Sequence, residues 1–383
     1  MDYSAKAIAN RPRPRWSDSI FGDRPETPLV PDTVTLGVLE GEGIGPDVIR
    51  AALRVLDAVA QKGRRKFQVR FGGLIGDKAE AVHGQPLSEE VIKFCGDVFA
   101  DGSPILAGPG GGRFVYDLRK KFDLFCKISP LNVSGELLDS IRVKREYVRD
   151  VDVLMVRENV AGVYQGNWTE HAAVNEGRRA EHSFSYTERE VRRILEVAAR
   201  LAKRRRGMLT VVIKDGGVPS ISNLWRSCAD DISREAGVEH FCLNVDNVAY
   251  QLVQSPHQFD VIVTSNLFGD ILADLGSVLL GSRALGYSGN FSSNHRAVYQ
   301  TSHGAAYDLV GKNQANPIGQ IFSLAMLLRE SFGLADEAEL VERAVARVWQ
   351  QGWRTCDLTN NGYRVVGTKE MGDLVAEALV DIS

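Results

Sequence analysis

Two aspartates that lie four residues apart are the pair with the most specific chemistry in this sequence. Asp270 and Asp274 stand in the segment Asn266–Asp274, directly after an apolar run that predicts a strand. Residues with this spacing share one face of a helix, and carboxylate oxygens are the ligands that Mg²⁺ or Mn²⁺ prefers. The pair could equally stand on a solvated helix surface, so the spacing alone predicts only a candidate metal site.

Three single residues could extend this chemistry, each with an ordinary alternative. Asp246, near the end of another apolar stretch, could add a third carboxylate ligand or could be a helix N-cap. Lys214 ends an apolar run at a predicted carboxyl edge of the sheet, where α/β proteins place their sites, but a surface lysine fits as well. Tyr164 follows a further apolar run and could donate a proton if cations surround it, or could simply be packed.

Two segments rich in small residues are candidates for ligand-binding loops. The first, Gly41–Pro46, lies between a predicted strand and a predicted helix. Because Pro46 occupies the last glycine position of the G-x-G-x-x-G pattern, the dinucleotide fingerprint fails. The second, Ser302–Pro317, combines small residues with His, Asp and Asn, which suits a loop against a flat polar ligand and also an ordinary connection.

These residues need a framework of strands and helices, and hydrophobic periodicity predicts one. A helix is expected over 47–60, and the expected strands span 34–39, 151–156, 209–213 and 259–264. Strands that alternate with helices predict an α/β protein with a mixed or parallel sheet.

Charge and cysteine content exclude several other classes. The 46 basic and 49 acidic residues give a net charge of −3, so no nucleic-acid partner is expected, and the basic run 203–206 is interpreted as a solvated helix end. The five cysteines form no C-x-x-C pair, which favours a reducing, cytoplasmic location. No apolar run is long enough to span a bilayer, and residues 1–33 are interpreted as an N-terminal extension without a signal sequence.

Six segments of the sequence, taken in order, resemble those of the β-decarboxylating dehydrogenases, the isocitrate/isopropylmalate dehydrogenase family. They are the Gly41–Pro46 loop, Arg157–Gly166, Lys214, Asp246, Asn266–Asp274 and the loop 303–317. The resemblance implies a two-domain α/β fold that is not a Rossmann fold. It also implies a large cofactor-binding domain from residues 34–125 and 281–383, and a small domain, 126–280, with dimer contacts.

The same resemblance implies the roles of the polar residues. Asp246, Asp270 and Asp274 would bind Mg²⁺ or Mn²⁺, while Tyr164 and Lys214 would be catalytic. In this family the lysine and one aspartate come from the neighbouring subunit, so Lys214 and Asp246 are expected to complete the active site of the partner in a homodimer.

Substrate and cofactor residues are likewise implied by the resemblance. Arg119 and Arg157 match arginines that bind the carboxylates of a malate-like small-molecule substrate. Asp308 matches an acidic residue that accepts the ribose hydroxyls of NAD and repels the 2′-phosphate of NADP. The remaining residues expected around the cofactor are His303, Gly304 and Asn316.

Two departures from the family pattern bear on the substrate. Ser129 stands where relatives usually have a third substrate-binding arginine, and Lys127 could compensate for that loss. Arg113 lies in the stretch that distinguishes substrate side groups, which lacks the apolar residues expected for an isopropyl group. We therefore predict a polar or anionic substituent.

The resulting hypothesis is metal-dependent, NAD-linked oxidative decarboxylation of a malate-type 2-hydroxy acid, isocitrate-like or phosphonomethylmalate-like. The alternatives within enzymes are a tartrate, D-malate or isopropylmalate dehydrogenase. The alternative of another class is a non-catalytic regulatory partner subunit, which the presence of Lys214, Tyr164 and all three aspartates disfavours.

Overall fold

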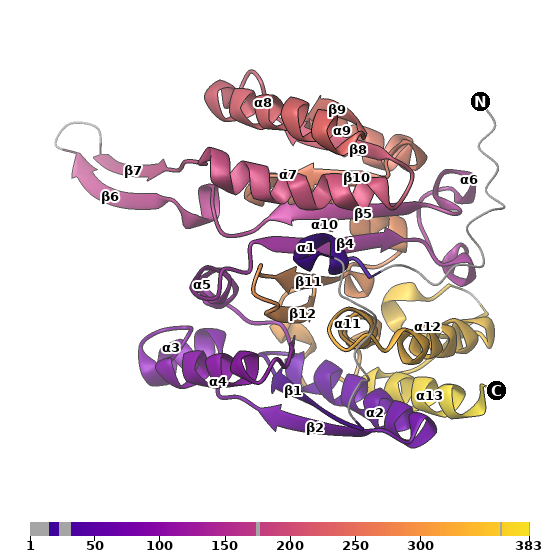
Figure 1. Cartoon of the computed structure of the whole chain (residues 1–383). Coiled ribbons are helices and arrows are strands. Elements are labelled where there is room, and N and C mark those ends of the chain that lie inside the picture. The colour runs from indigo at the N-terminus through magenta and orange to yellow at the C-terminus, as the bar shows by residue number, and fades with distance from the viewer. Residues whose placement is uncertain (1–14, 23–31, 174–176, 361, 383) are drawn as a thin grey trace.

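A single ten-stranded sheet forms the centre of the computed structural model, which describes residues 15–22, 32–173, 177–360 and 362–382 (Figure 1). Its strands lie in the order β2 (Lys66–Phe71), β1 (Thr33–Leu39), β3 (Ile105–Ala107), β12 (Ala297–Thr301), β11 (Tyr287–Phe291), β4 (Cys126–Asn132), β5 (Asp152–Glu158), β10 (Val261–Thr264), β8 (Met208–Ile213) and β9 (Glu239–Asn244).

The direction of the strands confirms the predicted α/β fold with a mixed sheet. The outer pairs are parallel, whereas β11 runs antiparallel to both β12 and β4, and β4 runs antiparallel to β5. A Rossmann domain has an all-parallel core with a different strand order, so the prediction that this is not a Rossmann fold is also confirmed.

The two halves of the sheet come from different parts of the chain. Strands β1, β2, β3, β11 and β12 derive from residues 33–107 and 287–301, while β4, β5, β8, β9 and β10 derive from 126–264. The strands of each half come from the residue ranges of one predicted domain, 34–125 plus 281–383 for the first half and 126–280 for the second. Whether the halves act as separate domains stays a prediction.

Helices pack on both faces of the sheet; α7 lies in front of it and α10 behind it in Figure 1. The helices that accompany the first half are α2 (Gly45–Gly63), α3 (Gly76–His83), α4 (Glu89–Ala100), α5 (Phe114–Lys121), α11 (Ile318–Glu330), α12 (Ala335–Gln350) and α13 (Thr368–Asp381). Those that accompany the second are α6 (Arg145–Val148), α7 (Glu188–Lys203), α8 (Pro219–Ala236), α9 (Val245–Gln254) and α10 (Asn266–Leu280).

Two smaller strand pairs lie outside the main sheet. The antiparallel strands β6 (Asn167–Ala173) and β7 (Gly177–Ser183) form an arm that extends from the body in Figure 1. The short parallel strands β13 (Trp353–Arg354) and β14 (Arg364–Val365) form the other pair. No helix within the described ranges has both the length and the apolar character needed to cross a membrane.

Part of the N-terminal extension packs onto the body between the two halves. Helix α1 (Asp18–Phe21) lies between α7 and α11 (Figure 1). The Ser17 N–H donates to the Glu330 carboxylate on α11 at 2.8 Å, and Arg200 on α7 donates to the Ser19 carbonyl at 2.6 Å. The rest of the extension, residues 1–14 and 23–31, lies outside the described residues.

The basic run 203–206 ends helix α7, as the sequence predicted, and Lys203, Arg204 and Arg206 are exposed to solvent. Arg205 donates to one oxygen of the buried Asp260 carboxylate at 2.7 Å, and the Arg206 N–H donates to the other at 2.8 Å. Only the half-buried Arg205 departs from that prediction, because Asp260, directly before β10, supplies a buried anion that a local pattern does not show.

Candidate active site

Arg157, near the end of β5, is the centre of the candidate site. Its Nη1 donates to Asp270 Oδ1 at 2.5 Å, while Nε and Nη2 donate to Asn266 Oδ1 at 3.0 and 2.7 Å. Strands β5 and β10 are parallel neighbours, with Thr264 opposite Arg157, so both end at the same edge of the sheet. Helix α10 begins immediately after β10, which places Asn266 and Asp270 beside the guanidinium.

Tyr164 reaches the same carboxylate from the turn that follows β5. Its hydroxyl donates to Asp270 Oδ2 at 2.8 Å. Partial burial and the hydrogen bond to Asp270 raise the pKa of Tyr164 above its ordinary value, so the phenol keeps its proton. Burial acts to raise the pKa of Asp270 as well, but the charge of Arg157 and the Tyr164 hydrogen bond outweigh it and lower that pKa. The pair is therefore a protonated phenol beside an ionised carboxylate.

Two further cations are buried around Arg157. Burial, and then the charge of Arg157, lowers the pKa of Arg119 on α5 to about 9. Burial followed by the charges of Arg119 and Arg157 lowers the pKa of Lys127 on β4 well below its ordinary value. The Arg119 Nε is buried and has no hydrogen-bond partner among the described residues. Buried cations without partners are costly, so this group of charges is suited to an anionic ligand.

Arg113 is the N-cap residue of α5 and contacts the turn that carries Tyr164. Its guanidinium carbon lies 4.6 Å from the ring centre of Trp168 and 5.5 Å from that of Tyr116, within the range of cation–π contacts. Its Nη2 also donates to the carbonyl of Tyr164 at 3.2 Å. Arg113 is thus held beside Tyr164, as a residue that reads the substrate's side group would need to be.

Ser129 lies farther from the centre than Lys127 does. On β4, Lys127 is paired with Arg157, and Ser129 is paired with the core residue Met155. Two residues along a strand separate side chains by about 7 Å. The structure therefore brings Lys127 to the cation group and leaves Ser129 toward the core, and the substrate-binding role of Ser129 stays a prediction.

Lys214 and Asp246 form a separate pair at the edge of the sheet. Lys214 Nζ lies 2.6 Å from Asp246 Oδ1, with the two side chains 39% and 67% exposed. The register of the parallel strands β8 and β9 brings them together, because Ile213 lies opposite Asn244. Asn244 is the N-cap residue of α9, so the alternative that Asp246 is an N-cap is wrong. The hydrogen bond from Lys214 lowers the pKa of Asp246.

The three aspartates predicted to bind metal are divided between these two places. Asp270 and Asp274 share α10, where Asp274 also pairs with Arg283 at 2.5 Å. Over the described ranges, no group of three His, Cys, Asp or Glu residues lies close enough to hold a metal ion. Two carboxylates on one helix face fit a hard divalent cation, but its remaining ligands would have to come from a substrate, water or another chain.

The loop expected to bind the nucleotide is partly suited to that role. His303 Nδ1 lies 2.9 Å from the Gly304 carbonyl, and its Nε2 is buried without a hydrogen-bond partner in the described part of the chain. Burial lowers the pKa of His303, which favours the neutral ring. Asp308 is exposed, whereas the buried Asn316 side chain donates to Asp357 at 3.1 Å. The unpartnered His303 nitrogen and exposed Asp308 fit a bound nucleotide, while Asn316 is already engaged.

Comparison with known proteins places this arrangement in a family. The family model described as isocitrate/isopropylmalate dehydrogenase matches residues 35–375. The chain belongs to the isocitrate/isopropylmalate dehydrogenase family. It is similar to the 3-isopropylmalate dehydrogenase of Carboxydothermus hydrogenoformans, with 39% identity over 90% of this chain and 94% of that protein. It is also similar to the 3-isopropylmalate dehydrogenase of Bacillus subtilis, with 38% identity over 85% and 92%.

Solved structures of this family have the same fold. The isocitrate dehydrogenase from Methylococcus capsulatus superposes with a TM-score of 0.81 at 29% identity, covering 91% of this chain and 99% of that one. The predictions of the family and of its decarboxylating-dehydrogenase fold are confirmed.

Three polar residues of this family member were not assigned a role from the sequence. Glu42 is fully buried and accepts the N–H groups of Lys78 and Gly111 at 2.7 and 2.6 Å, which fixes the loop that leads to Arg113. Asn266 orients Arg157, and the buried Glu158 binds the turn that carries Tyr164. The sequence did contain a signal for each residue. Glu42 lies in the glycine loop, and Glu158 and Asn266 each stand two residues after an apolar run that predicts a strand.

Proposed function

We propose that this chain is a metal-dependent, NAD-linked dehydrogenase that oxidatively decarboxylates a malate-type 2-hydroxy acid. The observation that carries the proposal is the buried group of Arg119, Lys127 and Arg157 around a single Tyr164–Asp270 pair. Three basic side chains with only one carboxylate among them suit a dianionic substrate, whose charge would favour the protonated form of Lys127, and a protonated phenol supplies a proton donor at the same place.

Each side chain has a distinct role in this reaction. Arg119 and Arg157 bind the carboxylates of the substrate by charged hydrogen bonds, and Lys127 adds a third positive charge. Lys214 assists the removal of the proton from the substrate hydroxyl as it is oxidised. Tyr164 donates its proton to the carbon that has lost its carboxylate as CO₂.

Two bound groups supply the rest of the chemistry. When bound, NAD accepts the hydride, and Mg²⁺ or Mn²⁺ stabilises negative charge on the substrate oxygens. Asp270 and Asp274 would hold the metal, and His303, Gly304, Asp308 and Asn316 would lie around the nucleotide. The free Nε2 of His303 and the exposed carboxylate of Asp308 support this placement.

A homodimer would complete the site. Lys214 and Asp246 are paired with each other and largely exposed, and among the described residues of one chain no third carboxylate joins Asp270 and Asp274. We infer that Lys214 and Asp246 act in the active site of a second copy of this chain, where Asp246 would be the third metal ligand.

Arg113 supports a polar or anionic side group on the substrate, as in an isocitrate-like or phosphonomethylmalate-like molecule. It is held by aromatic rings at the position next to Tyr164, and no aliphatic side chain precedes it in the glycine-rich stretch 110–112. A second candidate is isopropylmalate, because the similar curated proteins bear the name 3-isopropylmalate dehydrogenase.

The test is NADH formation by the purified chain with Mn²⁺ or Mg²⁺ and a panel of 2-hydroxy acids. The panel contains isocitrate, phosphonomethylmalate, isopropylmalate, D-malate and tartrate, with a chelator control and NADP as the competing cofactor. We expect chelator-sensitive turnover with NAD and preference for an anionic substrate. Arg113→Leu should then lower kcat/KM for that substrate by about tenfold to hundredfold, and much less for D-malate, which lacks the group.

Two alternatives predict different outcomes in this assay. Fast turnover of isopropylmalate together with silence on the anionic substrates would contradict the proposed side group and support the second candidate. Silence on all substrates with either cofactor would support the non-catalytic partner-subunit alternative.

A further inference from the structure

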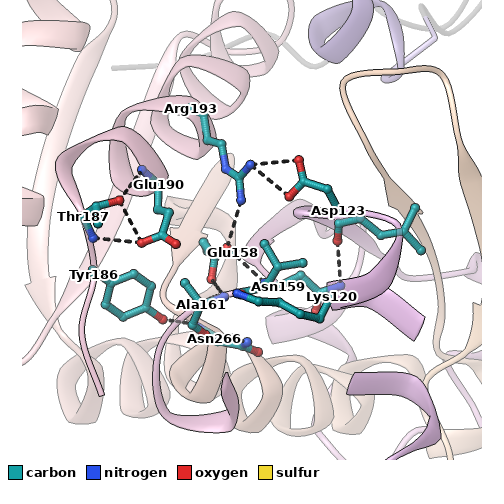
Figure 2. A network of polar contacts seen from close by, with 12 residues as sticks. Lys120, Asp123, Glu158, Asn159, Ala161, Tyr186, Thr187, Glu190, Arg193 and Asn266 are labelled. Atoms are coloured by element: carbon teal, nitrogen blue, oxygen red, sulfur yellow. Dashed lines mark hydrogen bonds and ion pairs between the residues drawn. The ribbon is translucent and has the colours of Figure 1, made fainter. Parts of the chain in front are cut away.

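Glu158 is a fully buried carboxyl group next to Arg157, and no role in the reaction has been given to it above. Its two oxygens accept the backbone N–H groups of Val160 and Ala161, each at 3.0 Å (Figure 2). These amides belong to the turn between β5 and Tyr164. One side chain therefore fixes the path of the backbone that carries the proposed proton donor.

The same turn is also held from the side of α10. Asn266 Nδ2 donates to the Ala161 carbonyl at 2.9 Å, and the Asn266 N–H donates to the Tyr186 hydroxyl at 3.0 Å. Ala161 is thus bound at both of its backbone polar groups. Gly162 follows with a φ of 73°, a conformation that other residues rarely adopt, and the chain then turns toward Tyr164.

A charged residue of α7 also faces the Glu158 carboxylate. Arg193 lies 3.9 Å from Glu158 Oε1 and donates to both oxygens of Asp123 at 3.1 Å (Figure 2). Lys120 donates to the Val160 carbonyl at 3.0 Å. The carboxylate therefore has two amide donors on one side and a cation on the other, and neither Arg193 nor Asp123 contacts the Arg157 group in the described structure.

We propose that Glu158 is a positioning residue that holds Tyr164 in place for proton transfer by binding the amides of Val160 and Ala161. This inference rests on the proposed role of Tyr164. The Glu158 side chain does not contact the Tyr164 hydroxyl in the described structure, so it acts on Tyr164 through the backbone of the turn. Misplacing a reacting group by about 1 Å can lower the rate by about a hundredfold. A small shift of this short turn would therefore be enough to misplace the Tyr164 hydroxyl.

Proton binding by Glu158 should weaken this hold. Burial raises the pKa of Glu158 to about 7; the two amides and Arg193 act to lower it, and Glu190 acts to raise it further. The other titratable groups that face it, Cys126 and Tyr186, keep their protons because burial raises both of their pKa values. Protonation turns one acceptor oxygen into a hydroxyl, so both amide bonds are strong only above about pH 7.

Activity and stability should therefore respond to pH in opposite directions. Because the folded-state pKa is raised above the ordinary value of 4.5, the stabilising effect of proton binding is complete below that value and is lost as pH rises through about 7. Turnover should instead rise through the same range, as the carboxylate forms and the turn tightens.

The experiment compares Glu158→Gln with Glu190→Gln, a matched change of a nearby carboxyl group. Glu190 belongs to the capping box of α7 with Thr187, a role that glutamine also fills. We expect Glu158→Gln to lower kcat by about tenfold to hundredfold with little change in KM, and to abolish the fall in kcat below about pH 7. Glu190→Gln should keep the maximal kcat and move that fall to lower pH.

Arg193→Gln completes the set, because loss of its positive charge should move the fall in kcat to higher pH. Opposite shifts from two residues of the same helix would not arise if Glu158 only filled space. Equal pH profiles in the wild type and all three variants would overturn the proposal, as would wild-type kcat in Glu158→Gln. If Glu158→Gln does not fold, the opposite shifts of the other two variants decide.

A second measurement needs no substrate and separates this inference from the proposed function. Amide hydrogen exchange of the segment 158–166 should be slow in the wild type above about pH 7 and faster in Glu158→Gln, with Glu190→Gln unchanged. Absence of turnover in the wild type would contradict the proposed function, while the exchange result would still judge the hold on the turn. Exchange that does not differ between wild type and Glu158→Gln would overturn it.

Discussion

The Arg157–Asp270 pair and the Lys214–Asp246 pair each join a basic side chain to an aspartate, but only the first has a buried cation. The Arg157 side chain is 3% exposed and that of Asp270 is 39% exposed, and Asp270 also receives the Tyr164 hydroxyl. The Lys214 and Asp246 side chains are 39% and 67% exposed. Each pair joins a cation to an aspartate at 2.5 or 2.6 Å, so distance alone does not distinguish them.

The difference indicates which pair is complete within one chain. Arg157 and Asp270 are fixed by Asn266 and Tyr164, so their geometry does not depend on another molecule. Lys214 and Asp246 have open sides, and an exposed ion pair adds little stability. The Arg157–Asp270 pair is therefore preorganised, whereas the open Lys214–Asp246 pair is available to a second copy of the chain.

The largest expected effect is on activity, and active-site complementation tests whether Lys214 acts in the neighbouring subunit. Tyr164→Phe and Lys214→Ala should each lower kcat by about 10²- to 10⁴-fold, because each removes a proton-transfer group. If Lys214 serves the neighbouring subunit, a dimer with one copy of each variant has one intact site. Random re-assembly of an equal mixture should then restore about a quarter of wild-type NADH formation, since about half of the dimers are mixed.

The same mixture also gives the contrary result clearly. Activity that remains at the level of the separate variants after re-assembly would show that Lys214 acts in its own chain. Re-assembly is checked by mass measurement of a mixed dimer in which one variant carries a tag.

If Asp246 and Asp270 bind the same metal ion, substitution of either one should change the metal requirement of the enzyme in the same way. Asp270→Asn and Asp246→Asn should each raise the Mn²⁺ concentration that gives half-maximal activity by about tenfold to hundredfold, because each removes a charged ligand. Asp215→Asn is the matched control, since Asp215 is exposed and pairs with Arg226 at 2.7 Å. A wild-type Mn²⁺ requirement in Asp246→Asn would exclude Asp246 from the metal site and separate the two regions.

Stability should distinguish the pairs most simply. Arg157→Met leaves Asp270 Oδ1 and the buried Asn266 oxygen without the Arg157 donors, and should lower the free energy of unfolding by about 2 to 3 kcal/mol in urea titrations. Lys214→Met removes an exposed cation and should leave the urea midpoint nearly unchanged. Equal losses in the two variants would show that the open pair is buried in solution.

The framework of the site could be predicted from the sequence because it depends on local periodicity. The strand expected over 34–39 is β1, and the helix expected over 47–60 lies within α2. Asp270 and Asp274 share a helix as their spacing predicted.

Contacts between distant residues could not be predicted in the same way. Asn266 binds Arg157 across 109 residues, and Glu42 binds Gly111 across 69. Neither contact leaves a periodic pattern, because each depends on which strands become neighbours in the sheet. The Lys214–Asp246 pair likewise depends on the register of β8 and β9, which composition does not determine.

The smallest expected effect is the response of the two aspartate pKa values to salt. The hydrogen bond from Lys214 lowers the pKa of Asp246, and Arg157 and Tyr164 lower that of Asp270 against the effect of burial. Because both pKa values are depressed, each pair stabilises the fold at neutral pH and loses that effect as pH falls through the folded-state pKa. Salt screens exposed charges far more than buried ones.

NMR titration of the two carboxyl groups at low and at about 1 M salt measures this difference, with Asp270 as the internal control. In the metal-free protein, the pKa of Asp246 should return toward its ordinary value in salt, while that of Asp270 stays low. If the Asp246 shift instead survives salt in the dimer but not in a variant that cannot dimerise, a second copy must cover the open pair. That outcome would place Lys214 and Asp246 against the neighbouring subunit by a measurement that needs neither substrate nor cofactor.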